Sequence, residues 1–223
     1  MLAFVLAWSA ALPAAAGGAV ASPAPEPTAA GDCSAAVAAR VQARYDGVQD
    51  LAAHFRQRTL SPALSQTQVA TGTVVFAKPG KMRWTYETPE PSIVVSDGHT
   101  LWMVDPEFKE VQVLPVGEGF LSGTAIDFLL GEGRIDEAFV VSARGCAEPI
   151  VDLHLVPREE ATYAYLELRV DARSGDLRGT ALEDLLGNHT EVWLDDVRTN
   201  QAPSPDAFVY VPSEEERVLR LAP

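Results

Sequence analysis

The first predicted element is a short amphipathic helix. It begins at Ser34, a residue suited to cap a helix N-terminus, and ends at Asp46-Gly47, because glycine commonly stops a helix. Apolar side chains recur at every fourth position of this segment. They are Val37, Val41 and Tyr45. The period then changes to two over residues 51–59, which is typical of a strand with one apolar face, and a polar loop over residues 61–65 follows.

The run from Gly72 to Met103 has the pattern of a meander of strands joined by turns. Lys78-Pro79-Gly80-Lys81 fits a type II turn, because proline presets φ at the second position and glycine accepts positive φ at the third. Asp97-Gly98 suits the two-residue type I′ turn of a hairpin. The strand between these turns is predicted to be apolar on one side. Its apolar face carries Met82, Trp84 and Tyr86, and its polar face carries Lys81, Arg83 and Glu87.

The second half of the chain adds a helical segment and further strands. A turn at Asp105-Pro106-Glu107 leads into a strand over residues 109–116. Glycines bracket residues 122–130, whose apolar side chains fall on one helical face, and this segment is the candidate lid. More strands are predicted at 150–156, 163–171, 177–186, 189–198 and 208–211. About ten antiparallel strands predict a mainly β (α+β) fold, a strongly curved sheet or incomplete antiparallel β-barrel with a helical lid.

The meander also carries a pattern that is characteristic of one protein family. The pattern joins a Gly-led strand, a basic residue before proline, an aromatic pair around Arg-Trp, a Pro-bounded turn, and Val-Ser-Asp-Gly followed by Leu-Trp. Here these elements are Gly72, Lys78-Pro79, Arg83-Trp84-Thr85-Tyr86, Pro89, Val95-Ser96-Asp97-Gly98 and Leu101-Trp102. The run closely resembles the periplasmic outer-membrane lipoprotein carrier family, LolA. A weaker similarity lies in Asp184 to Thr190, Asn200 and Phe208, and the resemblance covers roughly residues 34–215.

In that family an incomplete β-barrel, capped by helices, receives the acyl chains of lipoproteins. The resemblance implies the same use for the apolar face of this chain, and the flexible thioethers of its methionines suit a wall that repacks around varied ligands. A lid that must be displaced lowers the net affinity, so that an acceptor can take the cargo. The implied lipid-binding residues are Val74, Phe76, Met82, Trp84, Tyr86, Val94, Leu101 and Met103 on the strands, and Ile126, Leu129 and Leu130 on the lid.

Two basic residues match the family pattern. Lys78 stands at the basic position before proline, where the family's side chain hydrogen-bonds the lid-helix backbone, and it is therefore expected to latch the lid. The alternative is an ordinary solvated turn lysine. A single ammonium is a less directional latch than a guanidinium fork. Arg83 lies opposite Trp84 in the alternation and is expected to form a salt bridge on the outer face of the sheet.

The N-terminal part of the chain has the pattern of an export signal. Residues 1–21 contain no Asp, Glu, Lys or Arg, and the apolar run from Leu2 to Leu12 is too short to span a bilayer. Small residues follow, so we expect residues 1–21 to be a signal peptide, with a membrane anchor as the alternative. The Pro-rich residues 22–33 are expected to form a disordered linker, and residues 34–223 a single carrier-like domain.

Cysteine content and net charge bear on the compartment. An exported chain permits oxidation, so Cys33 and Cys146 are expected to form one disulfide, although two buried thiols are an alternative. In the chain-entropy model, closing so long a loop adds roughly 4–5 kcal/mol. A formal net charge of −14 repels nucleic acid and anionic headgroups. Such acidity commonly serves solubility, and we expect neither a nucleic-acid partner nor a stable oligomer.

No motif for catalysis or for metal binding is present in the sequence. The chain lacks HExxH, CxxC, a GxSxG nucleophile elbow and a phosphate-binding glycine loop. The pairs Asp97 with His99 and Asp152 with His154 are spaced to share a strand face and to bind a metal or act as acid and base, but such pairs beside hairpins are more often solvent-facing. We therefore expect no enzymatic activity, no cofactor and no metal.

The sequence thus favours a periplasmic carrier that holds lipoprotein acyl chains in an apolar groove and shuttles them from the inner to the outer membrane. The resemblance implies three partners: acylated lipoproteins, an inner-membrane ABC-type release complex and an outer-membrane acceptor. A periplasmic sensor or free-lipid-binding module on the same fold is the alternative function. A lipid-anchored acceptor is disfavoured, because Cys33 follows a polar, Pro-rich stretch and does not follow a short apolar segment.

Overall fold

The computed structural model describes residues 32–116 and 133–220, which form one sheet with two α-helices and two 3-10 turns. The helices are α1 (Ser34–Asp46) and α2 (Ile135–Ala138), and the 3-10 turns are η1 (Pro62–Leu64) and η2 (Pro205–Phe208). The strands are β1 (Asp50–Ser61), β2 (Gln66–Ala77), β3 (Lys81–Thr88), β4 (Ser92–Asp97), β5 (Thr100–Asp105), β6 (Glu110–Pro115), β7 (Phe139–Arg144), β8 (Ile150–Pro157), β9 (Tyr163–Asp171), β10 (Leu177–Asp184), β11 (His189–Thr199) and β12 (Arg217–Arg220).

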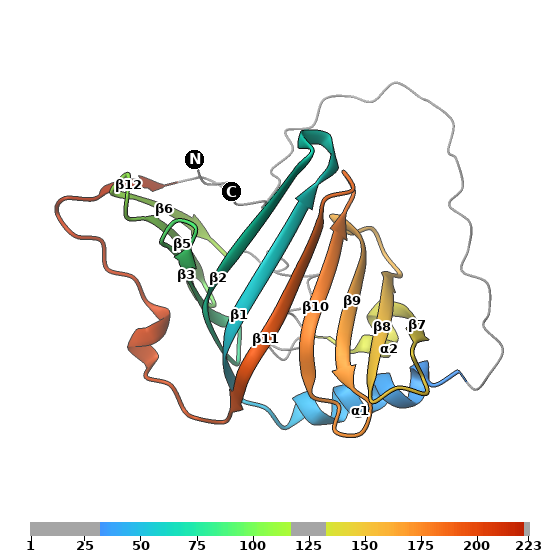
Figure 1. The fold of residues 1–223 in the computed structure, drawn as a ribbon. Coiled ribbons are helices and arrows are strands. Elements are labelled where there is room, and N and C mark those ends of the chain that lie inside the picture. The colour runs from blue at the N-terminus through green and yellow to red at the C-terminus, as the bar shows by residue number, and fades with distance from the viewer. Residues whose placement is uncertain (1–31, 117–132, 221–223) are drawn as a thin grey trace. The chain divides into compact units, whose positions relative to one another are not determined.

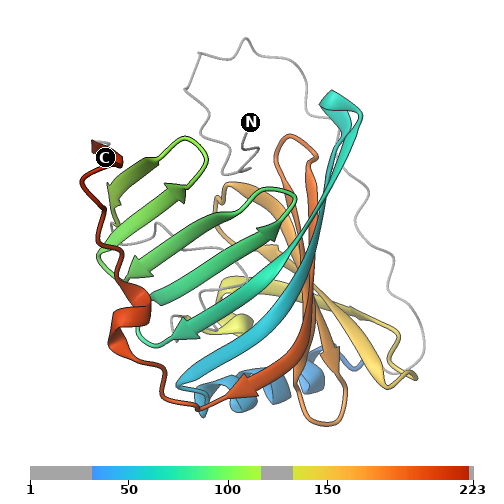
Figure 2. The same ribbon diagram turned by 60° about the vertical axis from the view of Figure 1, so that its left-hand side comes forward.

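The strands lie in a single curved sheet (Figures 1 and 2). Their order is β12-β6-β5-β4-β3-β2-β1-β11-β10-β9-β8-β7. Neighbouring strands are antiparallel, except that β12 pairs in parallel with β6. Because β12 and β7 end the order at opposite sides, the sheet is not closed into a barrel. The predicted fold class, mainly β with a strongly curved antiparallel sheet, is confirmed.

Helix α1 crosses the ends of the strands of one half of the sheet and contacts β7 and β8 (Figure 1). Its buried apolar side chains include the predicted stripe of Val37, Val41 and Tyr45. The Tyr45 hydroxyl accepts a hydrogen bond from the amide of Leu177 at 3.0 Å. Strands β8 and β9, which α1 partly contacts, carry paired leucines that are at most 1% exposed and form part of the core. These are Leu153 opposite Leu168 and Leu155 opposite Leu166.

A second apolar layer lies on the opposite face of the sheet, over β4, β5 and β6. Val104, Val111 and Val113 are buried there, and Tyr210 packs against them. Phe208, at the end of η2, is 2% exposed. The C-terminal segment therefore covers the outer face of this half of the sheet (Figure 2).

Helix α1 ends at Asp46, as predicted, but its capping differs from the prediction. Ser34 is the first residue of the helix and not its N-cap; Cys33 occupies the cap position, and the Asp32 carboxylate accepts a hydrogen bond from the Ser34 amide at 2.9 Å. Gly47 has φ of −86°, so the helix ends without the left-handed residue that glycine usually supplies. Cys33 and Cys146 form a disulfide that ties the start of α1 to the turn before β8.

The turn at Lys78-Pro79-Gly80-Lys81 has the predicted glycine conformation but an unexpected cis peptide bond. Gly80 has the predicted positive φ, 62°, but the Lys78–Pro79 peptide is cis. The second turn is displaced by one residue, because Ser96 pairs with Leu101 and the two central residues are Gly98 and His99. Gly98 has φ of 95° and His99 has no positive φ, so the turn is not type I′. The Asp97 carboxylate fixes it by accepting hydrogen bonds from the His99 and Thr100 amides.

The predicted closing strand over residues 208–211 is wrong. Phe208 ends η2, residues 209–211 are irregular, and the last strand of the described chain is β12. The reason is that Phe208 and Tyr210 cover a sheet face, which an extension of the sheet edge would not allow. The sequence also gave no signal for α2, a four-residue helix, or for the edge strand β7. The candidate lid, residues 122–130, lies outside the described residues.

Candidate functional site

The strand residues of the predicted lipid-binding set share one face of the sheet. One cross-strand row runs from Val74 through Trp84 and Val94 to Met103. A second row runs from Phe76 through Met82 and Ser96 to Leu101, and Tyr86 lies on the same side of β3. Side chains that are paired across strands point to the same side of a sheet. The register therefore assembles a continuous apolar face on β2 to β5, which we call the aromatic face.

An aromatic cluster lies at the junction of β1, β2 and β3 within this face. The ring centroids of Phe55 and Trp84 are 4.7 Å apart, and those of Phe55 and Tyr86 are 5.0 Å apart, both in edge-on geometry. Phe76 contacts Trp84 at 5.9 Å, and the rings of Trp84 and Tyr86 stack at 6.2 Å. Phe55 is the side chain that connects the cluster to β1. It was not included in the predicted set, although its place in the alternation of residues 51–59 carried the signal.

Residues of the aromatic face differ in their exposure. Phe76 is 4% exposed and Leu101 is fully buried, and Val74, Met82 and Val94 are also buried. Trp84, Tyr86 and Met103 are partly exposed. Burial raises the pKa of Tyr86, and its hydroxyl donates a hydrogen bond to the Gln57 side chain at 3.2 Å. The buried residues, Phe76 among them, therefore serve mainly as core, and Trp84, Tyr86 and Met103 provide the accessible surface.

The face itself requires a glycine. Gly72 lies opposite Tyr86, at a shift in the β2–β3 register. A Cβ atom at this position would be 1.9 Å from the carbonyl oxygen of Thr85 and 3.0 Å from the Phe55 ring. Only glycine lets the two strands approach this closely and leaves space for the aromatic cluster. The Gly-led strand of the sequence pattern thus has a steric cause.

Lys78 joins the β2–β3 turn to helix α1. Its ammonium donates a hydrogen bond to the carbonyl oxygen of Tyr45 at 2.6 Å. A cation is favoured at this end of a helix, where carbonyl groups lack helical partners. Burial lowers the pKa of Lys78, and the nearby Asp46 opposes that effect. Lys78 was expected to contact the backbone of residues 122–130, which lie outside the described residues; the partner in the described chain is α1.

Arg83 lies on the outer face, as the alternation predicts, but among residues 32–116 and 133–220 its partner is not a carboxylate. The guanidinium donates a hydrogen bond to the carbonyl oxygen of Ala207 at 3.1 Å. Arg83 therefore holds η2 against β3, and the predicted salt bridge is replaced by a contact with the C-terminal segment.

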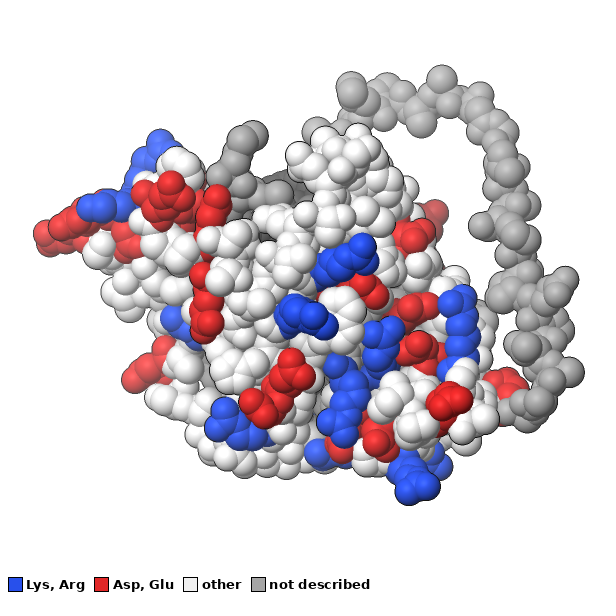
Figure 3. Space-filling view, in the orientation of Figure 1, with Lys and Arg blue, Asp and Glu red and all other residues white. Residues whose placement is uncertain are grey.

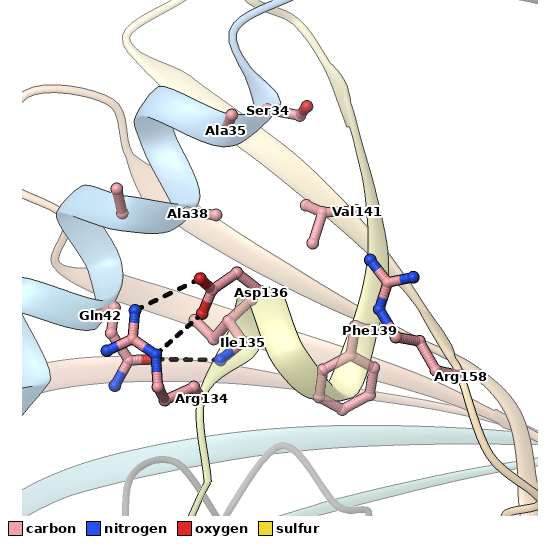
Figure 4. A pocket seen from close by; sticks show the side chains of 11 residues that line it. Ser34, Ala35, Ala38, Gln42, Arg134, Ile135, Asp136, Phe139, Val141 and Arg158 are labelled. Carbon is pink, nitrogen blue, oxygen red and sulfur yellow. Dashed lines mark hydrogen bonds and ion pairs between the residues drawn. The ribbon is translucent and has the colours of Figure 1, made fainter.

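A separate cleft of about 340 Å³ lies between α1, α2 and β7 (Figure 4). Alanines of α1 face Phe139 and Val141 of β7 across it, and Arg134 and Arg158 stand at its sides. The Gln42 side chain accepts a hydrogen bond from the Ile135 amide at 3.0 Å and so fixes α2. Asp136 contacts Arg134 at 3.2 Å and raises the pKa of that guanidinium. Sequence reasoning missed this cleft because α2 and β7 gave no pattern of their own.

The histidine and aspartate pairs have structural partners. The Asp97 carboxylate accepts backbone hydrogen bonds within its own turn. Asp152 forms an ion pair with Arg169 at 3.0 Å, and His154 faces Glu167 at 3.3 Å on the outer face of the sheet. The hydrogen bond with His154 lowers the pKa of Glu167. Within residues 32–116 and 133–220, no group of three or more His, Cys, Asp or Glu side chains is arranged to hold a metal ion.

Comparison with known proteins gives consistent matches over this fold. Residues 46–211 match the family model described as outer membrane lipoprotein carrier protein LolA. An outer-membrane lipoprotein carrier protein of Dechloromonas aromatica is 30% identical over 162 residues, which are 73% of this chain and 77% of the relative. The carrier protein of Methylococcus capsulatus is 29% identical over 175 residues, 78% of this chain and 82% of the relative.

Solved structures show a similar fold. The crystal structure of an uncharacterised conserved protein from Thermus thermophilus superposes with a TM-score of 0.52 at 11% sequence identity. The similarity covers 84% of this chain and 98% of that chain. At this level of identity the comparison concerns the fold alone.

Proposed function

Since this chain belongs to the outer-membrane lipoprotein carrier family, LolA, we propose that it holds the acyl chains of lipoproteins against the aromatic face of β2 to β5. The family is one of carriers and not of enzymes. The observation that carries this proposal is the partial exposure of Trp84, Tyr86 and Met103 on a face whose other apolar residues are buried. Large, partly exposed aromatic side chains at the centre of a curved sheet provide an apolar surface that the core does not use.

The remaining features of the carrier are part of the same proposal. Ile126, Leu129 and Leu130 supply the apolar side of a lid that competes with the cargo. Cargo is received from an inner-membrane ABC-type release complex and passed to an outer-membrane acceptor. Residues 1–21 direct export to the periplasm, residues 22–33 form a linker, and residues 34–223 form the carrier domain. Among the described helices, none is long and apolar enough to cross a membrane.

Lys78 has a revised role in this proposal. Its hydrogen bond to the Tyr45 carbonyl joins the β2–β3 turn, which borders the aromatic face, to the C-terminal end of α1. Movement of α1 away from the sheet must break this contact or carry the turn with it. Lys78 therefore resists opening of the groove by movement of α1. This role does not depend on a contact between Lys78 and residues 122–130.

The tryptophans of the described chain allow a direct test. Trp84 belongs to the aromatic face, whereas Trp102 packs on the outer apolar layer and Trp193 lies under the Arg56 guanidinium. In the mature chain without residues 1–21, which contain Trp8, the variant W102F/W193F keeps Trp84 alone and reports on the aromatic face. The matched variant W84F/W193F keeps Trp102 alone and reports on the opposite face. Each is titrated with a triacylated lipopeptide whose acyl chains carry bromine atoms, which quench nearby tryptophans.

We expect saturable quenching of Trp84 and little change for Trp102. Equal quenching of both tryptophans, or quenching of neither at saturating lipopeptide, would contradict the proposal. Mass spectrometry of the chain purified from periplasm under native conditions then identifies the cargo. Acylated protein is the expected companion, while free lipid alone would favour the sensor or lipid-binding alternative.

A further inference from the structure

Exposed leucines gather at one end of the sheet, outside the aromatic face. Leu64, in the β1–β2 turn, is 66% exposed, and Leu185 and Leu186, in the β10–β11 turn, are 68% and 65% exposed. The two turns are neighbours, because β1 pairs with β11 up to Leu60 opposite His189. The Ser61 hydroxyl also donates a hydrogen bond to the Asn188 side chain at 2.7 Å. We call these two turns, residues 61–66 and 185–188, the uncharged tip; they project side by side in Figures 1 and 2.

The tip is built to hold its leucines outward. Both oxygens of the Asp184 carboxylate accept hydrogen bonds from the β10–β11 turn, from the Leu186 amide at 2.8 Å and from the Asn188 side chain at 2.7 Å. In the other turn, Pro62 starts η1 and Ser65 closes it with a left-handed φ of 50°. Both turns are therefore internally bonded, and presenting the leucines costs little further conformational entropy.

The charge distribution sets this end apart from the rest of the molecule. The sequence contains no Asp, Glu, Lys or Arg from Thr59 to Ala77, and none from Leu185 to Thr190, in a chain with a net charge of −14. Figure 3 shows the contrast: charged side chains cover the lower part of the sheet, and the upper ends of β1 and β2 are free of them on this face. Serine, threonine, glutamine and asparagine surround the leucines, and the adjacent Asp184 carboxylate is hydrogen-bonded within its own turn. These surroundings tolerate a zwitterionic surface.

We propose that the uncharged tip inserts into the interfacial region of a lipid bilayer. The leucines project from two convex turns and do not line a groove, so a fluid surface accommodates them without a preformed pocket. The neutral side chains add no charge repulsion at the point of contact, and the acidic remainder of the chain makes a zwitterionic surface more favourable than an anionic one. Few leucines and no cationic residues make this contact weak and reversible, which suits a protein that leaves the membrane again.

The test compares tip and control variants in vesicle flotation. The full mature chain is mixed with vesicles of phosphatidylcholine, beside the variant L64S/L185S/L186S and the control F108S/V211S. The control removes apolar side chains that are 62% and 82% exposed elsewhere on the surface. All of these positions are exposed, so both variants are expected to fold; circular dichroism and the urea midpoint verify this.

We expect the wild-type chain and the control to float with the vesicles, and the tip variant to show a partition coefficient lower by roughly tenfold or more. Adding phosphatidylglycerol should weaken wild-type binding, and salt should restore it. The proposal is overturned if the wild-type chain does not float, or if tip variant and control bind equally. It is also overturned if only proteoliposomes bearing an acceptor capture the chain, because the tip is then a protein contact. The result is independent of Trp84 quenching, so either proposal can fail alone.

Discussion

Replacing Gly72 with alanine perturbs the aromatic face at its closest backbone approach. The added Cβ lies 1.9 Å from the Thr85 carbonyl oxygen and 2.9 Å from the Thr85 carbonyl carbon. A backbone carbonyl cannot rotate away as a flexible side chain does, so β2 and β3 must separate at this point. The Phe55 ring, whose Cε1 atom would be 3.0 Å away, must also shift from its contact with Trp84.

The expected cost follows from these two movements. Over-packing a well-packed site costs about 1–3 kcal/mol, and each cross-strand hydrogen bond that is lost adds about 1 kcal/mol. We therefore expect Gly72→Ala to lower the free energy of unfolding by about 2–5 kcal/mol. With a urea m-value of about 2–3 kcal/mol/M, the midpoint falls by roughly 0.7–2.5 M.

Urea unfolding followed by circular dichroism measures this change, and Trp84 fluorescence in the W102F/W193F background reports on the cluster itself. Gly47→Ala is the matched control, because the nearest atom to its added Cβ is the Arg44 carbonyl oxygen at 3.8 Å and its φ is −86°. The free energy of unfolding of this control is expected to exceed that of wild type by at most about 1 kcal/mol. Coincident midpoints for Gly72→Ala and wild type would refute the steric argument.

Three further changes test other contacts. Lys78→Met removes the hydrogen bond to the Tyr45 carbonyl, so it should lower the free energy of unfolding by about 1–2 kcal/mol and speed hydrogen exchange in the last turn of α1. Unchanged exchange would argue against the contact. The control is Lys109→Met, which removes an exposed ion pair with Glu215 and should lower the free energy of unfolding by less than about 0.5 kcal/mol. Glu167→Gln tests a pH dependence: the pKa of Glu167 is held below its ordinary 4.5 by His154, so its contribution is fully present above about pH 4.5 and is lost as pH falls toward the lowered value. The difference in free energy of unfolding between this variant and wild type should shrink from pH 6 to pH 3. A constant difference would show that the Glu167 carboxylate is not the source of the pH dependence. Glu148→Gln, at an exposed position, is the control. Cys33→Ser with Cys146→Ser opens the disulfide and should lower the free energy of unfolding by about 2–5 kcal/mol, read from the thermal midpoint; a loss below about 1 kcal/mol would show that hydrogen bonds alone hold the start of α1.

Much of the sheet was predictable because alternation and turn chemistry are local signals. Met82, Trp84 and Tyr86 alternate with polar residues, so their common face followed from the sequence alone. The position of the hairpin turn did not follow from the sequence, because Asp97-Gly98 suits a turn as its first two or its central residues. The structure has Gly98 first among the central residues, since the Asp97 side chain bonds the amides that follow it.

Other features depend on contacts that are distant in sequence. Phe208 to Val211 alternates like a strand, but Arg83 and the apolar layer of β4 to β6 draw this segment onto a sheet face. The contact of Lys78 with Tyr45 joins residues 33 positions apart, and nothing in the lysine's own neighbourhood indicates it. Helix α2 has four residues, too few for a helical period to appear, so the cleft beside it was invisible in the sequence.

The aromatic cluster also bears on how a carrier releases its cargo. Burying an acyl chain contributes roughly 0.8 kcal/mol per CH₂, so several chains enclosed in an empty, rigid groove would approach the limit of non-covalent affinity. Trp84 already contacts Phe55, Phe76 and Tyr86, and an entering chain must displace or share these ring contacts, each of which contributes about 0.5–1.5 kcal/mol. Under the function proposed above, the cluster thus opposes binding in the empty protein and favours release. By this reasoning, a face lined with aliphatic residues alone would bind acyl chains more tightly and deliver them less readily.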